Sequence, residues 1–122
     1  MNPNDYTYSP PEWLYNGFPL HNEDDDSIDL NLALIVCREL LAATTDSDFT
    51  PLGRALHIAH SLVTLQSEQG DWPIRWHGKT GEPIGPETSC EPLALFRQLK
   101  DRLKTTEFDR VIARAEAGIS SK

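Results

Sequence analysis

The chain of 122 residues has few cysteines, no long apolar run and almost no basic residues in its first half. Cys37 and Cys90 are too few for a disulfide scaffold and stand in no close-spaced metal pattern, so we expect free, buried thiols. No apolar run approaches the roughly 18 residues that span a bilayer. The N-terminus has neither the basic leader nor the apolar stretch of a secretory signal. We therefore expect a cytoplasmic protein, without membrane association, that builds one modest core.

The acidic charge is concentrated in the first part of the chain. Residues 1–50 contain ten acidic residues and one basic residue, Arg38, whereas residues 51–122 contain nine acidic and ten basic residues. The first part therefore has a net charge of −9 and the second of +1, which together give the total of −8. Nucleic-acid binding relies on Lys and Arg to neutralise phosphates, so we expect no nucleic-acid partner. A basic protein partner fits this charge better.

Apolar residues at three- and four-residue steps predict two helices in the first half. The first begins after Asp26 or Ser27 and ends near Ala43, and the second begins with Thr50 as its cap and is stopped by Gly70. The expected buried stripes consist of Leu30, Ala33, Leu34, Cys37, Leu40 and Leu41 in the first helix and of Leu52, Ala55, Leu56, Ala59, Leu62, Val63 and Gln66 in the second. Leu32, Ile35 and Val36 extend the apolar girth of the first helix. A helix of this kind is typically sandwiched between layers or contacts a second chain, which favours self-association as an alternative to another partner.

Two shorter helices are predicted in the second half. The third begins near Thr88, whose spacing to Glu91 fits a capping box, and the fourth follows Thr106. Their core stripes are Leu95, Phe96, Leu99 and Leu103, and then Phe108, Val111, Ile112 and Ala115. No segment alternates apolar and polar residues long enough to predict a strand, and "WPIRW" would pair only briefly. We expect a single all-α domain over residues 1–122, with about four helices arranged as two α-hairpins.

The first 26 residues have no helical period and contain Pro10, Pro11 and Pro19, so we expect an extended or irregular arm. The arm is rich in large apolar side chains: Tyr6, Tyr8, Trp13, Leu14, Tyr15 and Phe18. We expect them to pack across the helices. The alternative is a detachable segment that binds a partner.

A long loop rich in Trp, Gly and Pro separates the second and third predicted helices. Loops of such length in compact domains are often functional, and its tryptophans argue against disorder. Trp72 and Trp76 stand beside Asp71, Arg75 and His77. Indole faces stack on apolar sugar faces while polar groups bind hydroxyls, so these five residues are the candidate ligand-binding set.

Residues 55–99 resemble a helical hairpin of α/α toroid proteins, of the terpene cyclase and prenyltransferase repeat type and of toroidal polysaccharide lyases. The matching positions are Leu62, Leu65, Gln66, Gly70, Asp71 and Trp72, followed by Glu91, Leu93, Ala94 and Leu95. The resemblance implies that the Gln66 side chain reaches the backbone of the next helix and that Trp72 stacks on it. It also implies the alternative function, a toroid-derived enzyme fragment or binding module for a saccharide or isoprenoid ligand.

Two groups of residues are of the types that bind metals. Asp25, Asp26 and Asp29 in "DDSID" match the aspartate-rich pattern of class I terpene synthases and prenyl diphosphate synthases, which holds magnesium. The alternative is an acidic helix N-terminus favoured by the helix dipole. The other group, His57, His60, His77 and Cys90, would need two loop residues to fold back onto the second helix to form a zinc site. We expect no metal and no cofactor.

Nucleophilic catalysis has only weak candidates. Ser89 and Cys90 stand at a predicted helix start with His77 as a candidate base, but serine and threonine are also ordinary helix caps. Lys79 and Thr80 lack the glycine spacing of a phosphate loop. We assign no catalytic residue and expect a small, acidic, non-catalytic interaction or accessory protein, such as an inhibitor or immunity-type partner of a more basic protein.

Overall fold

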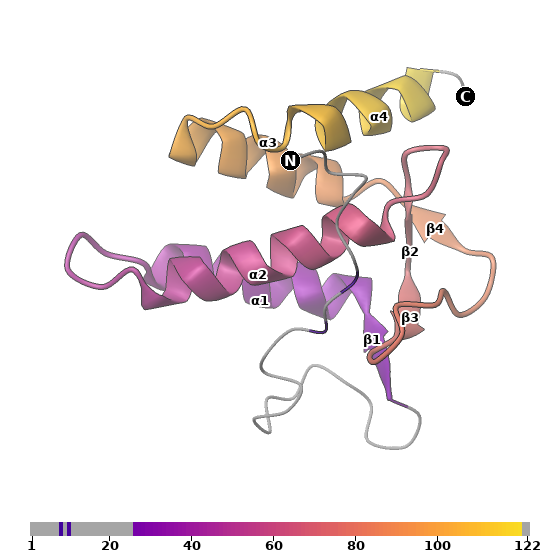
Figure 1. Ribbon diagram of the computed structural model, residues 1–122, viewed down its shortest axis with the longest axis horizontal. Helices are drawn as coiled ribbons and strands as arrows, with labels where there is room; N and C mark the ends of the chain where they lie inside the picture. Colours follow the sequence, from indigo (N-terminus) through magenta and orange to yellow (C-terminus); the bar gives the residue numbers. More distant parts are fainter. Residues whose placement is uncertain (1–7, 9, 11–25, 121–122) are drawn as a thin grey trace.

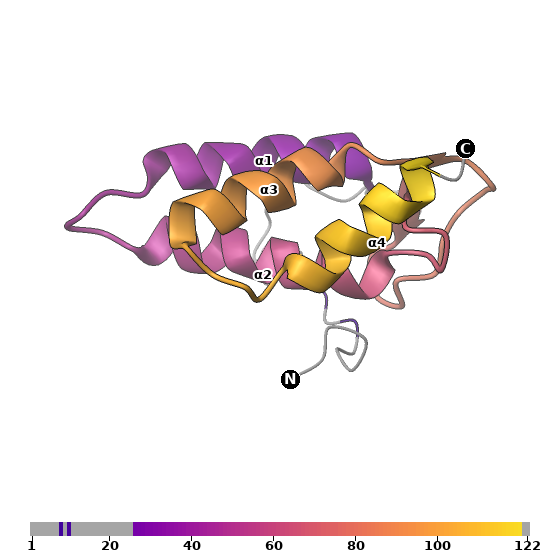
Figure 2. The ribbon, with the colours of Figure 1, turned by 90° about the horizontal axis from the view of Figure 1, so that it is seen from above.

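The computed structural model describes Tyr8, Pro10 and residues 26–120. These residues form the helices α1 (Leu30–Ala43), α2 (Thr50–Leu65), α3 (Pro92–Leu103) and α4 (Asp109–Ser120), and the strands β1 (Ser27–Asp29), β2 (Trp72–Pro73), β3 (Arg75–His77) and β4 (Thr88–Ser89). In Figure 1, α1 and α2 form one layer, the hairpin of α3 and α4 forms a second layer, and the strands lie at one end of both. Figure 2 shows α3 and α4 crossing above α1 and α2. None of the described helices is long and apolar enough to cross a bilayer.

The expected all-α fold is wrong, because the chain also forms two small antiparallel sheets. β1 pairs with β3, with Ser27 opposite His77, and β2 pairs with β4, with Trp72 opposite Ser89. As a result, α1 begins only at Leu30 and α3 only at Pro92. Strands of two or three residues are too short to show alternation, and the partner of β1 is far away in the sequence. The brief pairing expected for "WPIRW" is confirmed by β2 and β3, but no local pattern revealed their partners β1 and β4.

Further hydrogen bonds join the two sheets into one ribbon whose central segment is 72–77. Ile74 lies between β2 and β3, and its carbonyl accepts from the Leu30 N–H at 2.9 Å while its own N–H donates to Glu87 O at 3.3 Å. The segment that contains Glu87 makes a second bond to the central segment, because the Ile84 N–H donates to Arg75 O at 2.9 Å. The long loop is therefore paired on both sides and held against the start of α1.

The helix starts differ in detail from the predicted caps. Thr50 is the first residue of α2, and its N–H donates to Asp48 Oδ1 at 3.0 Å. Hydrogen bonds from the Thr50 backbone and side chain lower the pKa of the Asp48 carboxyl. The Thr88–Glu91 capping box is absent, because Thr88 belongs to β4 and Glu91 itself occupies the cap position of α3. Ser89 Oγ instead accepts from the Glu91 N–H at 3.1 Å.

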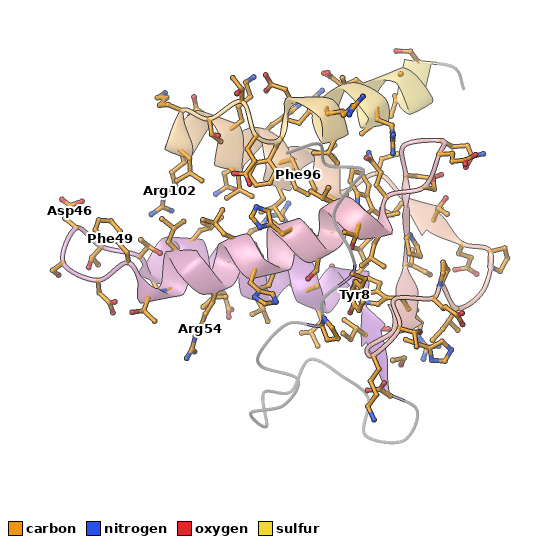
Figure 3. All side chains as sticks on the ribbon, viewed as in Figure 1. Tyr8, Asp46, Phe49, Arg54, Phe96 and Arg102 are labelled. Atoms are coloured by element: carbon orange, nitrogen blue, oxygen red, sulfur yellow. The ribbon has the colours of Figure 1, made fainter. Side chains whose placement is uncertain are left out.

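The predicted core stripes are largely buried. Leu40, Leu52, Leu56 and Leu103 are half-buried at the margins, whereas the other apolar members of the stripes are buried. Leu32 and Val36, which extend the girth of α1, also pack against the core, and Ile35 stays 43% exposed. An aromatic row made of Trp72, Phe96 and Phe108 runs through the core, with centroid separations of 5.8 and 5.2 Å. Phe96 projects from α3 (Figure 3).

The turn between α2 and β2 packs tightly on α4. The Gln66 side chain donates to Gly70 O at 3.1 Å and to Val111 O of α4 at 3.0 Å. Gly70 has φ +91°, and a Cβ there would lie 2.2 Å from the Arg114 carbonyl oxygen. A Cβ on Gly118 would likewise lie 2.0 Å from Gln69 O. Because Gly70 and Gly118 have no side chains, the backbone of the turn can contact the backbone of α4 directly.

The predicted arm is described only at Tyr8 and Pro10, and its other rings lie outside the described residues. The Tyr8 side chain is half-buried and packs on the segment after β3. Asp26, the first residue of the segment 26–120, has φ +55° and leads directly into β1.

Candidate functional site

The two tryptophans of the candidate ligand-binding set are buried. Trp72 is 0% exposed, stacks on Phe96 at an interplanar angle of 18°, and donates its indole N–H to Leu62 O at 2.8 Å. Trp76 is 3% exposed and donates its indole N–H to the Tyr8 hydroxyl at 3.2 Å. Both indoles therefore pack against the protein itself.

Two polar members of the set, Asp71 and Arg75, are bonded to neighbouring parts of the fold. Asp71 is buried and accepts a hydrogen bond from the Ser67 hydroxyl, and the backbones of the same two residues bond at 2.8 Å. Arg75 of β3 lies 3.2 Å from Asp29 Oδ1 and donates to Ser27 Oγ at 2.9 Å, so it joins β3 to β1. His77 is exposed. The structure thus brings Arg75 together with β1 and places Asp71 in the preceding turn.

The four residues considered for zinc belong to different surroundings. His60 Nε2 lies 2.6 Å from Glu107 Oε1, and its ring packs on Phe108. His57 Nε2 is buried and has no hydrogen-bond partner. His77 is in β3 and Cys90 follows β4. Among the described residues, no three His, Cys, Asp or Glu side chains are grouped to hold a metal ion.

Asp26 and Asp29, the described carboxylates of the "DDSID" segment, do not lie on a helix. Asp25 lies outside the described residues. Asp26 precedes β1, where its carbonyl accepts from the Gly78 N–H at 2.7 Å. Asp29 ends β1 and pairs with Arg75. The strand between Asp26 and Asp29 replaces the helical turn that a diphosphate-binding magnesium motif requires.

The candidate nucleophiles have structural roles or are shielded. Ser89 Oγ is the acceptor for the Glu91 N–H, and Cys90 is half-buried before α3. The Cys37 thiol is fully buried and donates to Ala55 O at 3.5 Å. Burial raises the pKa of Cys37 to about 12, against the weaker opposing effect of Arg38. Since the thiolate is the reactive species, Cys37 is an inert core residue at neutral pH.

A surface groove of about 540 Å³ lies along the hairpin of α3 and α4. Its rim is charged, but the charges are internally paired. Arg97 lies 2.6 Å from Glu116, and Lys100 pairs with Asp109 across the two helices. An external ion would have to compete with these pairs.

The feature that the sequence reasoning missed is an acidic edge, made of Glu82, Glu87 and Glu91. All three are exposed and belong to the segment 82–91, which contains no Lys or Arg. Backbone groups of this segment also hydrogen-bond to the ribbon. For example, Glu82 O accepts from the His77 N–H at 2.9 Å. Whereas acids on α4 are paired with bases, no ion pair involves these three glutamates within the described part of the chain. The local signal was present, because three acids and no base occur in ten residues.

Comparisons with protein families, curated proteins and solved structures give no match to this chain.

Proposed function

We propose that this is a non-catalytic interaction protein and that its acidic edge docks on the basic surface of a protein partner, as an inhibitor does. The observation that carries the proposal is that Glu82, Glu87 and Glu91 are exposed and that none of them takes part in an ion pair with another described residue. Opposite charges on two proteins steer their encounter and fix their register.

The backbone of the acidic edge favours recognition through side chains. The segment is hydrogen-bonded to the central strand through Ile84 N–H and Glu87 O, so the glutamates are held on a paired backbone. Pro83 and Pro86 have no N–H group to offer to an added strand. A partner that bound by adding a strand would find few backbone N–H donors along this segment. A partner with a basic surface would need only the exposed carboxylates.

The alternative, a saccharide or isoprenoid module built on the 70–90 loop, has less support. Such a ligand would need an exposed ring face, but Trp72 and Trp76 are 0% and 3% exposed. Arg75 already pairs with Asp29 and Ser27. The interaction proposal requires no rearrangement of these contacts.

The test compares two double variants with the same change of net charge. One is Glu82→Lys with Glu87→Lys on the acidic edge. The other is Glu39→Lys with Asp46→Lys, two exposed residues of α1 and of the α1–α2 loop, the latter at the end opposite the strands (Figure 3). Each variant and the unchanged chain are used to isolate binding proteins from native extract, and the main basic protein is then purified and titrated.

We expect the edge variant to bind the purified partner about tenfold or more weakly, mostly through slower association, while the control variant binds nearly as the unchanged chain does. Equal weakening in both variants would show that only overall charge matters. Unchanged binding in the edge variant would contradict the proposal.

A further inference from the structure

Tyr8 packs on the ribbon against Trp76, Gly78 and Gly81, and we call the space that these three residues leave for its ring the slot. Its hydroxyl donates to Gly78 O at 3.0 Å and accepts from the Trp76 indole N–H at 3.2 Å. These contacts join positions 70 and 68 residues apart in the chain. Figure 3 shows Tyr8 beside the strand end of the fold.

The shape of the slot depends on glycine. Gly81 has φ +78°, and a Cβ there would lie 2.8 Å from the Tyr8 ring. The ring therefore lies where any side chain at position 81 would stand. Both the conformation and the contact require glycine.

Backbone pairing holds the slot without help from Tyr8. The Gly81 N–H donates to His77 O at 2.8 Å, and the Gly78 N–H donates to Asp26 O at 2.7 Å. Trp76 is paired with Ile28 in the ribbon. The slot is thus part of the ribbon, and its occupant is a separate segment.

The two polar groups of the slot select a phenol. The indole N–H of Trp76 can only donate, and the carbonyl of Gly78 can only accept. One hydroxyl at the edge of an aromatic ring satisfies both at once. A phenylalanine ring would fit the space and leave both groups without this partner.

We propose that Trp76, Gly78 and Gly81 form a tyrosine-recognition slot that Tyr8 occupies in cis, and that a tyrosine side chain of a partner peptide binds there by displacing Tyr8. Tyr8 then acts as an internal competitor. Because a tethered occupant has an effective concentration of roughly millimolar, an external tyrosine binds well only when Tyr8 is removed or released. The proposal uses the geometry of the slot and is independent of the acidic edge.

The experiment uses p-cresol, which is the side chain of tyrosine, and toluene, which lacks the hydroxyl. Both are titrated into the full chain and its Tyr8→Ala variant while the indole N–H signals of the ¹⁵N-labelled protein are recorded. We expect p-cresol to bind Tyr8→Ala with saturation and to return the Trp76 indole signal toward its original position. It should bind roughly tenfold to a hundredfold more tightly than toluene, the ratio for two net hydrogen bonds.

The unchanged chain and a Tyr15→Ala variant serve as matched controls. Both retain Tyr8, so each should bind p-cresol at least tenfold more weakly than Tyr8→Ala does. Equal affinity for p-cresol and toluene, or an unmoved Trp76 signal, would overturn the slot as a tyrosine site. Equal p-cresol affinity in all three proteins would overturn the role of Tyr8 as its occupant.

Tyr8→Phe provides a second test that keeps the ring and removes the hydroxyl. The Trp76 indole signal should shift while that of Trp72, which donates to Leu62 O, stays in place. If Tyr8→Ala does not fold, this variant decides alone, and an unchanged Trp76 signal contradicts the proposal.

Discussion

Gly70 and Gly53 differ in what an added methyl group would meet. At Gly70 the backbone has φ +91°, and a Cβ would lie 2.2 Å from the Arg114 carbonyl oxygen and 3.0 Å from Ala115 Cα. At Gly53, an exposed residue of α2, nothing lies within 4 Å. The same substitution therefore has opposite consequences at the two positions.

We expect Gly70→Ala to lower the free energy of unfolding by about 3 kcal/mol, because it combines left-handed backbone strain with overlap against a backbone that cannot rotate away. Gly53→Ala should raise it by about 0.5–1 kcal/mol through higher helix propensity. Urea titration followed by circular dichroism measures both. A Gly70→Ala protein as stable as the unchanged chain would refute the close contact between the turn and α4.

The end of α2 is attached to α4 by one side chain. Gln66 follows the last residue of the helix and donates to Gly70 O and to Val111 O, whereas Gln69 in the same turn is exposed. Removing the Gln66 amide leaves two carbonyls without this donor. We expect Gln66→Ala to destabilise the fold by about 1–3 kcal/mol.

Gln69→Ala is the matched control and should change stability by no more than about 0.5 kcal/mol. Hydrogen exchange adds a local measurement, since amides near Val111 in α4 should exchange faster in Gln66→Ala than in the control. Equal effects of the two variants would mean that the turn is held by its glycines and not by Gln66.

Elements differ in how far the sequence predicted them. The four helices and most of their buried residues follow from local periodicity, because a stripe of apolar residues is repeated over three or more turns. The strands follow only as a brief pairing within "WPIRW", since β1 and β3 are three residues each and become strands only by pairing across the fold. The capping box at Thr88 was a correct local pattern that the pairing of β4 with β2 overrode.

The candidate site was only partly predictable for the same reason. The composition of the loop predicts Trp72, Trp76 and Arg75 as ligand-binding candidates. Whether an indole is exposed, however, depends on contacts from distant segments. Phe96 covers Trp72, and Tyr8 bonds to Trp76. The unpaired state of the glutamates at the acidic edge likewise depends on where the bases lie in space. Sequence could identify the loop, and the fold determined which of its side chains are available.

At the scale of the whole molecule, the two helical layers share one core. The aromatic row links β2 through Trp72 to α3 through Phe96, and Phe108 at the start of α4 contacts both Phe96 and His60 of α2. Phe96 and Phe108 are each 0% exposed. Because no layer has a separate core, we expect the described residues to unfold together in one transition, as single domains of this size usually do.

Phe96→Ala tests this shared core. It should cost about 3–5 kcal/mol, a large share of the roughly 5–15 kcal/mol that stabilises an ordinary domain, and should lower the midpoint for both layers equally. Phe49→Ala is the control, because Phe49 lies 62% exposed in the α1–α2 loop, away from the strands (Figure 3), and should change stability by no more than about 0.5 kcal/mol. In a Trp13→Phe background, tryptophan fluorescence reports on Trp72 and Trp76 of the ribbon, and circular dichroism reports on the helices. If the two signals separate in Phe96→Ala, with the helices of one layer surviving after the ribbon has unfolded, the layers are independent and the single-core description is wrong.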